Sequence, residues 1–96
     1  MTEYEMVTLF HPRLDEDGVT EISEWLQQRI AELGGENMEV QPWGRRSLAY
    51  PVEKQTEATY IQYDFSLEGS QMVSLTRAMQ LNEDILRQLP IRKQDR

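Results

Sequence analysis

Cysteine is absent from this 96-residue chain, and histidine occurs only once. Without cysteine the protein has no disulfide framework and no thiolate metal site, which is consistent with a reducing compartment. The single histidine, His11, has no second histidine or cysteine with which to share a metal ion. We therefore interpret His11 as a structural residue at the end of a strand, and the sequence predicts no cofactor and no bound metal.

Long apolar runs and glycine-rich loops are missing as well. No apolar segment approaches the roughly 20 residues that a membrane-spanning helix needs. The first residues, Met-Thr-Glu-Tyr-Glu, lack the basic start and the apolar stretch of a signal peptide. P-loop spacing is also missing, because Gly34 and Gly35 stand where a helix should end. We expect a cytoplasmic protein without a membrane partner, and the length predicts a single domain over residues 1–96.

Positive charge is scarce and unevenly distributed. The chain has 10 lysine and arginine residues against 17 aspartate and glutamate residues, a net charge of −7. Residues 1–41 hold ten acids and two bases, whereas residues 42–96 hold seven acids and eight bases. Affinity for phosphate depends on cations that displace counterions, so an acidic chain binds nucleic acid poorly on its own. Any RNA contact should therefore be local and helped by a partner.

The spacing of apolar residues predicts four strands and two helices. The first helix is expected to start at the acidic run 15–17, where Asp15 or Asp17 can cap it, and its apolar stripe runs from Val19 to Leu33. The second helix follows another candidate cap, Ser70, and ends near Asn82. The strands are expected over residues 4–10, over 38–41 with a resumption over 47–52, over 59–65 and over 85–92. Between the two parts of the second strand, Pro42 is expected to disturb the pairing and Gly44 allows a bulge or kink.

The resulting order β-α-β-β-α-β is typical of an α+β, ferredoxin-like domain, in which two helices cover one face of a four-stranded antiparallel sheet. The other face is left partly open for a partner or a ligand. Tyr63 and Phe65 alternate along one strand and are expected on the same face. We also expect Leu48 to face the core, residues 53–58 to form a polar turn, and Pro90 to mark an edge strand.

The most informative stretch is a pair of adjacent arginines in this otherwise acidic protein. Arg45 and Arg46 follow Trp43 closely. Guanidinium groups offer forked donors to phosphate and flat faces for stacking. The alternative interpretation is that Trp43 and Tyr50 are packing residues and that the arginines belong to a solvated turn. A second basic cluster lies near the C-terminal end and consists of Arg87, Arg92, Lys93 and Arg96.

Tyr63 and Phe65 invite a comparison with the RNA-recognition motif, which stacks bases on strand aromatics in the same order of elements. The signature of that motif includes a basic residue and a glycine. Residues 59–65 contain neither and carry Asp64. We therefore do not expect these two aromatic side chains to bind RNA.

Three separated segments resemble the family of the sixth protein of the bacterial small ribosomal subunit. Residues 44–52, Gly-Arg-Arg-Ser-Leu-Ala-Tyr-Pro-Val, are similar to the family signature of a glycine, basic residues, Leu-Ala-Tyr-Pro and an aliphatic residue. Near the start, Tyr4 and Glu5 open a short apolar strand that is followed by Pro12. Residues 81–87 are similar to the family pattern of an asparagine, an acid, aliphatic residues and an arginine. The resemblance extends over nearly the whole chain.

This resemblance implies a structural ribosomal protein of the cytoplasm, with no catalytic activity and no small-molecule substrate. It implies binding to the central domain of 16S ribosomal RNA together with the eighteenth small-subunit ribosomal protein, as a heterodimer. It identifies Arg45, Arg46 and Arg87 as the RNA-binding candidates. Weaker candidates for the partner or RNA interface are Trp43, Tyr50, Lys54, Arg92 and Lys93.

A ferredoxin-like regulatory or ligand-binding domain that homodimerises through its sheet is the alternative function. A stable homodimer that a metabolite stabilises further would identify it. A small acyl-phosphate hydrolase would need an arginine and an asparagine at one oxyanion, and Asn37 and Asn82 have no evident arginine partner in the sequence.

Overall fold

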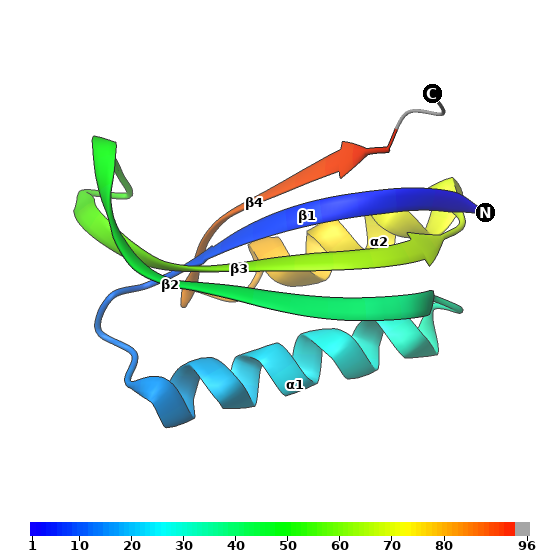
Figure 1. The fold of residues 1–96 in the computed structure, drawn as a ribbon, viewed down its shortest axis with the longest axis horizontal. Helices are drawn as coiled ribbons and strands as arrows, with labels where there is room; N and C mark the ends of the chain where they lie inside the picture. The colour runs from blue at the N-terminus through cyan, green and yellow to red at the C-terminus, as the bar shows by residue number, and fades with distance from the viewer. Residues whose placement is uncertain (94–96) are drawn as a thin grey trace.

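The computed structural model describes residues 1–93 and has the predicted order of strands and helices (Figure 1). In chain order the elements are β1 (Thr2–Phe10), α1 (Glu16–Glu32), β2 (Glu36–Val52), β3 (Gln55–Leu67), α2 (Gly69–Gln80) and β4 (Ile85–Arg92). The strands form one antiparallel sheet in the order β2-β3-β1-β4, so β2 and β4 are its edges. The α+β ferredoxin-like fold is confirmed, and Pro90 lies on an edge strand as predicted.

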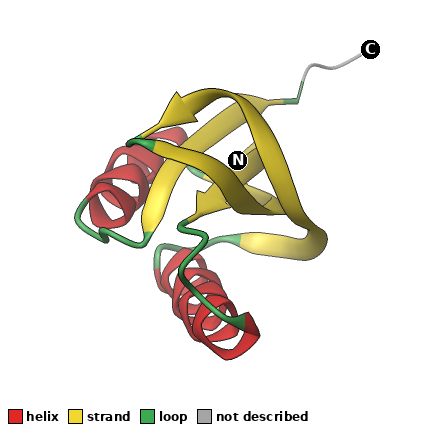
Figure 2. Cartoon of the chain, turned by 90° about the vertical axis from the view of Figure 1, so that its left-hand side faces the viewer, coloured by secondary structure: helices red, strands yellow, loops and turns green. Residues whose placement is uncertain are grey.

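Both helices lie on the same face of the sheet (Figure 2). Successive side chains of a strand point to opposite faces. On β1 the residues Tyr4, Met6 and Phe10 face the helices and belong to the core, and on β3 the odd-numbered residues from Ile61 to Leu67 do so. The described part of the chain places no helix on the opposite face. We call that surface the open face.

The two helices are held differently at their N-terminal ends. Of the two predicted cap residues, Asp15 caps α1, because its Oδ1 accepts a hydrogen bond from the backbone N–H of Gly18 at 2.7 Å, and Asp17 lies in the first turn. The predicted cap of α2 is wrong: the cap position is Glu68, which makes no side-chain cap hydrogen bond, and Ser70 lies inside the first turn. Since α2 buries Met72, Leu75 and Met79, packing fixes this helix.

The β2–β3 hairpin is where the sequence prediction fails most clearly. β2 runs without a break to Val52 and β3 begins at Gln55, so the interrupted strand and the polar turn over residues 53–58 are both wrong. The turn consists of Glu53 and Lys54, whose φ angles of 49° and 66° are typical of a two-residue hairpin turn. Pairing with β3 up to Ser47 and again at Val52, with an irregularity between them, therefore overrides the weak local pattern of these polar residues.

The distal part of this hairpin, residues 45–57, curls away from the rest of the sheet (Figure 1). We call it the arm. Leu48 lies on the arm and is only half-buried, so the prediction that it faces the core is wrong. A segment that extends past the helices has no core to face, and its apolar alternation then carries no information about burial.

A buried hydroxyl pair joins β3 to α1. The Tyr63 hydroxyl donates to Ser23 Oγ at 2.8 Å, and the Gln27 side-chain amide donates to the same oxygen at 3.2 Å. Burial raises the pKa of Tyr63 to about 12, against the smaller, opposite effect of the hydrogen bond to Ser23. Tyr63 is therefore neutral in the folded protein at every pH below that value.

We expect Tyr63→Phe to lose about 1 kcal/mol of unfolding free energy at neutral pH, because one buried hydrogen bond disappears. The raised pKa means that the folded state keeps a proton that the unfolded state loses above pH 10. The wild-type stability should therefore fall between pH 10 and about 12, and the Phe variant should lose less over that range. Urea unfolding at several pH values measures both effects. Tyr50→Phe, at an exposed position on the arm, is the control. If both variants lost the same amount of stability at alkaline pH, the loss could not come from the raised pKa of Tyr63.

Thr8 is fully buried in β1, and its hydroxyl oxygen has no hydrogen-bond partner within the described residues. A buried hydroxyl without a partner costs about 1–3 kcal/mol. Thr8→Val keeps the shape and removes the hydroxyl, so it should raise the unfolding free energy by about 1 kcal/mol and the melting temperature by about 4–8 °C. Differential scanning calorimetry tests this. Thr8→Ser, which keeps the hydroxyl and opens a cavity, should instead lower the melting temperature.

Candidate nucleic-acid interface

Cross-strand pairing arranges the open face into three rows that cross all four strands. Residues that pair directly across a sheet lie on the same face, and successive rows are about 7 Å apart. We name them the aromatic row, nearest the arm, then the middle row and the acidic row. In the strand order β2, β3, β1, β4, the aromatic row consists of Gly44, Tyr60, Leu9 and Arg87. The middle row consists of Gln41, Gln62, Val7 and Leu89. The acidic row consists of Glu39, Asp64, Glu5 and Ile91.

The two adjacent arginines point to opposite faces of the sheet. Arg45 pairs with Thr59 and Arg46 with Ala58, so strand alternation places Arg45 on the helix side and Arg46 on the open face. Arg45 Nη2 donates to the carbonyl oxygen of Pro12 at 2.7 Å, and its Nη1 lies 3.4 Å from Glu57 Oε1. Arg45 therefore ties the arm to the loop between β1 and α1, whereas Arg46 is directed to the open face.

Arg46 lies beside two stacked aromatic rings. Trp43 and Tyr60 are parallel to within 7°, with ring centroids 5.8 Å apart. The guanidinium carbon of Arg46 lies over the Trp43 ring, 5.6 Å from its centroid. A bulge in β2 makes this possible, because Trp43 and Gly44 together occupy the place opposite Tyr60. Gly44 has a φ of 83°, a conformation that glycine adopts without strain.

Tyr60 is the site residue that the sequence analysis missed. The signal was present, because Tyr63 and Phe65 alternate on one face and Tyr60 therefore lies on the other. Tyr63 and Phe65 are buried in the core, so they do not present their rings as an RNA-recognition motif would. The aromatic pair on the open face comes instead from two neighbouring strands.

The remaining predicted residues do not gather in one place. Arg87 is exposed at the β4 end of the aromatic row. Arg92 and Lys93 lie at the other end of β4, about 17 Å further along the strand by the usual rise per residue. Tyr50 and Lys54 lie on the arm, where Tyr50 is 81% exposed. The second basic cluster is thus divided along β4, and its last member, Arg96, lies outside the described residues.

The acidic row lies about 13 Å from the aromatic row. Its central residue, Asp64, is buried, and its two carboxylate oxygens accept hydrogen bonds from the side-chain amides of Gln41 and Gln62, each at 2.9 Å. Glu39 and Glu5 pair with Asp64 from either side. The open face is therefore positive and aromatic at one end and negative at the other.

Comparison with known proteins identifies the family. The family model described as ribosomal protein S6 matches residues 3–92. The chain belongs to the ribosomal protein S6 family. Small ribosomal subunit protein bS6 of Dictyoglomus turgidum is 40% identical to this S6-family chain over 87 residues, which are 91% of this chain and 90% of the relative. The corresponding protein of Heliobacterium modesticaldum is 36% identical over 95 residues, 99% of each chain.

A solved structure agrees with this assignment at the level of the fold. The crystal structure of 30S ribosomal protein S6 from Thermotoga maritima matches with a TM-score of 0.90 over 96% of this chain and 87% of that chain, at 24% identity. Membership of the S6 family makes this chain a small-subunit ribosomal protein of the cytoplasm and not an enzyme. None of the helices within residues 1–93 is long and apolar enough to cross a membrane.

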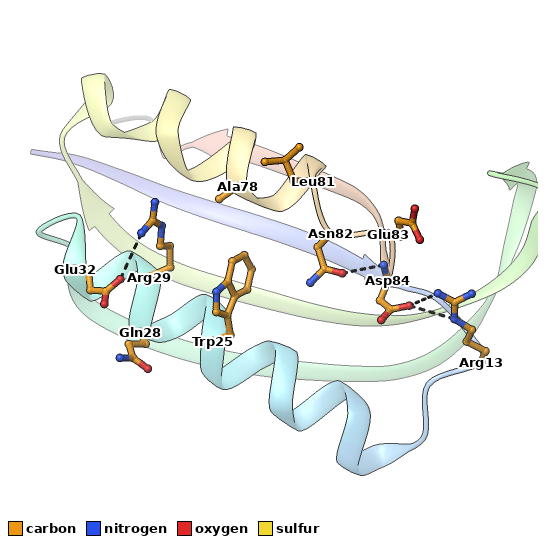
Figure 3. A pocket seen from close by; sticks show the side chains of 10 residues that line it. All are labelled: Arg13, Trp25, Gln28, Arg29, Glu32, Ala78, Leu81, Asn82, Glu83 and Asp84. Atoms are coloured by element: carbon orange, nitrogen blue, oxygen red, sulfur yellow. Dashed lines mark hydrogen bonds and ion pairs between the residues drawn. The ribbon is translucent and has the colours of Figure 1, made fainter.

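The S6-family chain also has a groove of about 790 Å³ between its two helices (Figure 3). Trp25 of α1 points into it. Arg13 Nε donates to Asp84 Oδ1 at 3.1 Å, and Arg29 Nη1 lies 3.6 Å from Glu32 Oε1. The lining holds two arginines and three carboxylates, so its net charge is −1. This groove therefore suits phosphate less well than the aromatic row.

The opposite orientation of the two arginines predicts different effects of their removal. Arg45→Ala should increase the amide hydrogen exchange of arm residues 47–57, because it removes the bonds to Pro12 and Glu57. Arg46→Ala should leave exchange in that segment close to wild type. Native-state exchange measured by NMR compares the two variants directly. Equal protection of the arm in both would show that the Arg45 contacts do not hold it.

Proposed function

We propose that this chain binds the central domain of 16S ribosomal RNA together with the eighteenth small-subunit ribosomal protein, and that each ligand takes a different part of the open face. The observation that carries the proposal is the polarity of that face. Arginines and aromatic rings lie at the arm end, exposed apolar side chains lie along β4, and carboxylates lie at the far end.

RNA is expected at the arm end of the open face, where Arg87 extends from the aromatic row on β4 and Arg46 extends from β2, two residues past Gly44. β2 and β4 are three strand spacings apart, about 14 Å, so the two guanidinium groups suit two separate phosphates. Contacts to the RNA backbone orient it without reading its sequence. Two arginine side chains displace few counterions from RNA. A chain with a net charge of −7 therefore needs a basic partner for most of its affinity for RNA.

The partner protein is expected over the middle row and the acidic row. Leu89 and Ile91 are 45% and 58% exposed, and Ile91 pairs directly with Glu5 of the acidic row. An apolar patch beside carboxylates suits a protein surface with aliphatic anchors and lysine or arginine side chains. A second copy of this chain is a poorer occupant, because each copy carries a net charge of −7.

We expect Arg46→Ala and Arg87→Ala each to weaken RNA binding by the preformed heterodimer about tenfold, since each removes one charged hydrogen-bond donor. Each variant should also reduce the slope of log affinity against log salt concentration by about one. Filter binding at several salt concentrations, with a transcript of the 16S central domain, measures both quantities.

Arg77→Ala is the matched control, because Arg77 is exposed on α2 and its removal changes the net charge by the same amount. A loss of affinity as large as that of the Arg46 variant would show that net charge alone accounts for the effect. Isothermal titration of the two wild-type proteins tests the other half of the proposal. Failure to form a heterodimer would remove the eighteenth protein as the partner.

A further inference from the structure

We propose that an unpaired RNA base stacks on the Trp43 and Arg46 pair, so that the aromatic row binds a nucleobase as well as phosphates. This inference rests on the proposed function and names the part of the RNA that the site receives. It concerns Trp43 of the hairpin, which stacks on Tyr60 and lies under the guanidinium group of Arg46.

The first argument is that the aromatic site is formed in advance. Trp43 is held parallel to Tyr60 at 5.8 Å, and yet 39% of its surface is exposed. The bulge at Gly44 directs this ring onto the open face. The ring is not part of the hydrophobic core there, so packing of the core does not account for it. A ring that is already oriented loses little conformational entropy when a flat ligand stacks on it.

The second argument is the chemistry of the neighbours. A guanidinium group over a tryptophan ring combines a flat stacking surface with donors for phosphate oxygens. Unpaired RNA bases are recognised by stacking on aromatic side chains and on arginine planes. Every base has a flat face, so such a site accepts an unpaired base of any identity.

The third argument is the charge on the open face, which decides between RNA and protein as the occupant. The carboxylates of the acidic row lie about 13 Å from Tyr60, so an anionic ligand is repelled from that end and accepted at the aromatic row. Within the three rows of the open face, the exposed aliphatic side chains Leu89 and Ile91 lie on β4 and not beside Trp43. The aromatic end therefore favours a base with its phosphate over an apolar protein side chain.

The test uses the fluorescence of Trp43 in the complete complex. The chain has two tryptophans, so Trp25→Phe leaves Trp43 as its single reporter. The eighteenth protein is prepared with any tryptophan replaced by phenylalanine. We expect no large change when the heterodimer forms and strong quenching of Trp43 emission when the central-domain transcript is added. The matched control is Trp43→Phe with Trp25 retained, whose emission should change little.

A second measurement locates the base. Transcripts in which single nucleotides are made abasic should reveal one unpaired position where wild-type affinity falls about tenfold. Trp43→Leu, which keeps an apolar side chain and removes the ring, should bind the unmodified transcript about tenfold more weakly. It should lose nothing further at that abasic position. Thermal unfolding checks that the Trp43→Leu variant is folded. The fluorescence test does not use this variant.

Three outcomes would overturn the inference. Unchanged Trp43 emission in an RNA-bound complex would show that no base stacks there, and it would leave the proposed function intact. Quenching by the eighteenth protein alone, with no further change on adding RNA, would assign Trp43 to the protein interface. A wild-type heterodimer that binds no RNA would refute the proposed function and this inference together.

Discussion

The alternation of side chains along β3 is the constraint on which the rest of the structure depends. β3 is hydrogen-bonded on both sides, by β2 and by β1, and one of its faces is covered by helices. If the pairing of β3 shifted by one residue, Tyr63 and the other core residues of this strand would point to the solvent side, and their neighbours in sequence would point to the helices. Burial of Tyr63 and its hydroxyl bond to Ser23 therefore fix the register, and the same register places Tyr60 and Asp64 on the open face.

The order of elements could be predicted from the sequence because its signals are local. The apolar stripe of α1 and the cap at Asp15 each involve residues within a few positions of one another. The continuous β2 strand was beyond such reasoning, since Pro42 and Gly44 usually interrupt a strand. Here a bulge accommodates both, and hydrogen bonds to β3 continue on either side. The two-residue turn at Glu53 and Lys54 depends on the same long-range pairing.

The candidate site was predicted only in part, for a similar reason. Alternation alone would have separated Arg45 from Arg46, and it would have placed Tyr60 opposite Tyr63. The association of Arg87 with the aromatic pair is different, because it requires the register of all four strands at once. Sequence spacing carries no information about that association. The net charge suggested a dependence on a partner, but it did not show that the charge is polarised along one face.

The prolines of the two edge strands have a consequence for the chain before it joins a ribosome. β2 contains Pro42 and Pro51, and β4 contains Pro90. Proline has no N–H group, so neither edge presents an unbroken ladder of donors to a strand from another molecule. The apolar residues of the open face are thus exposed on a sheet whose borders resist extension. A newly made chain is protected from edge-to-edge aggregation while that face is still uncovered.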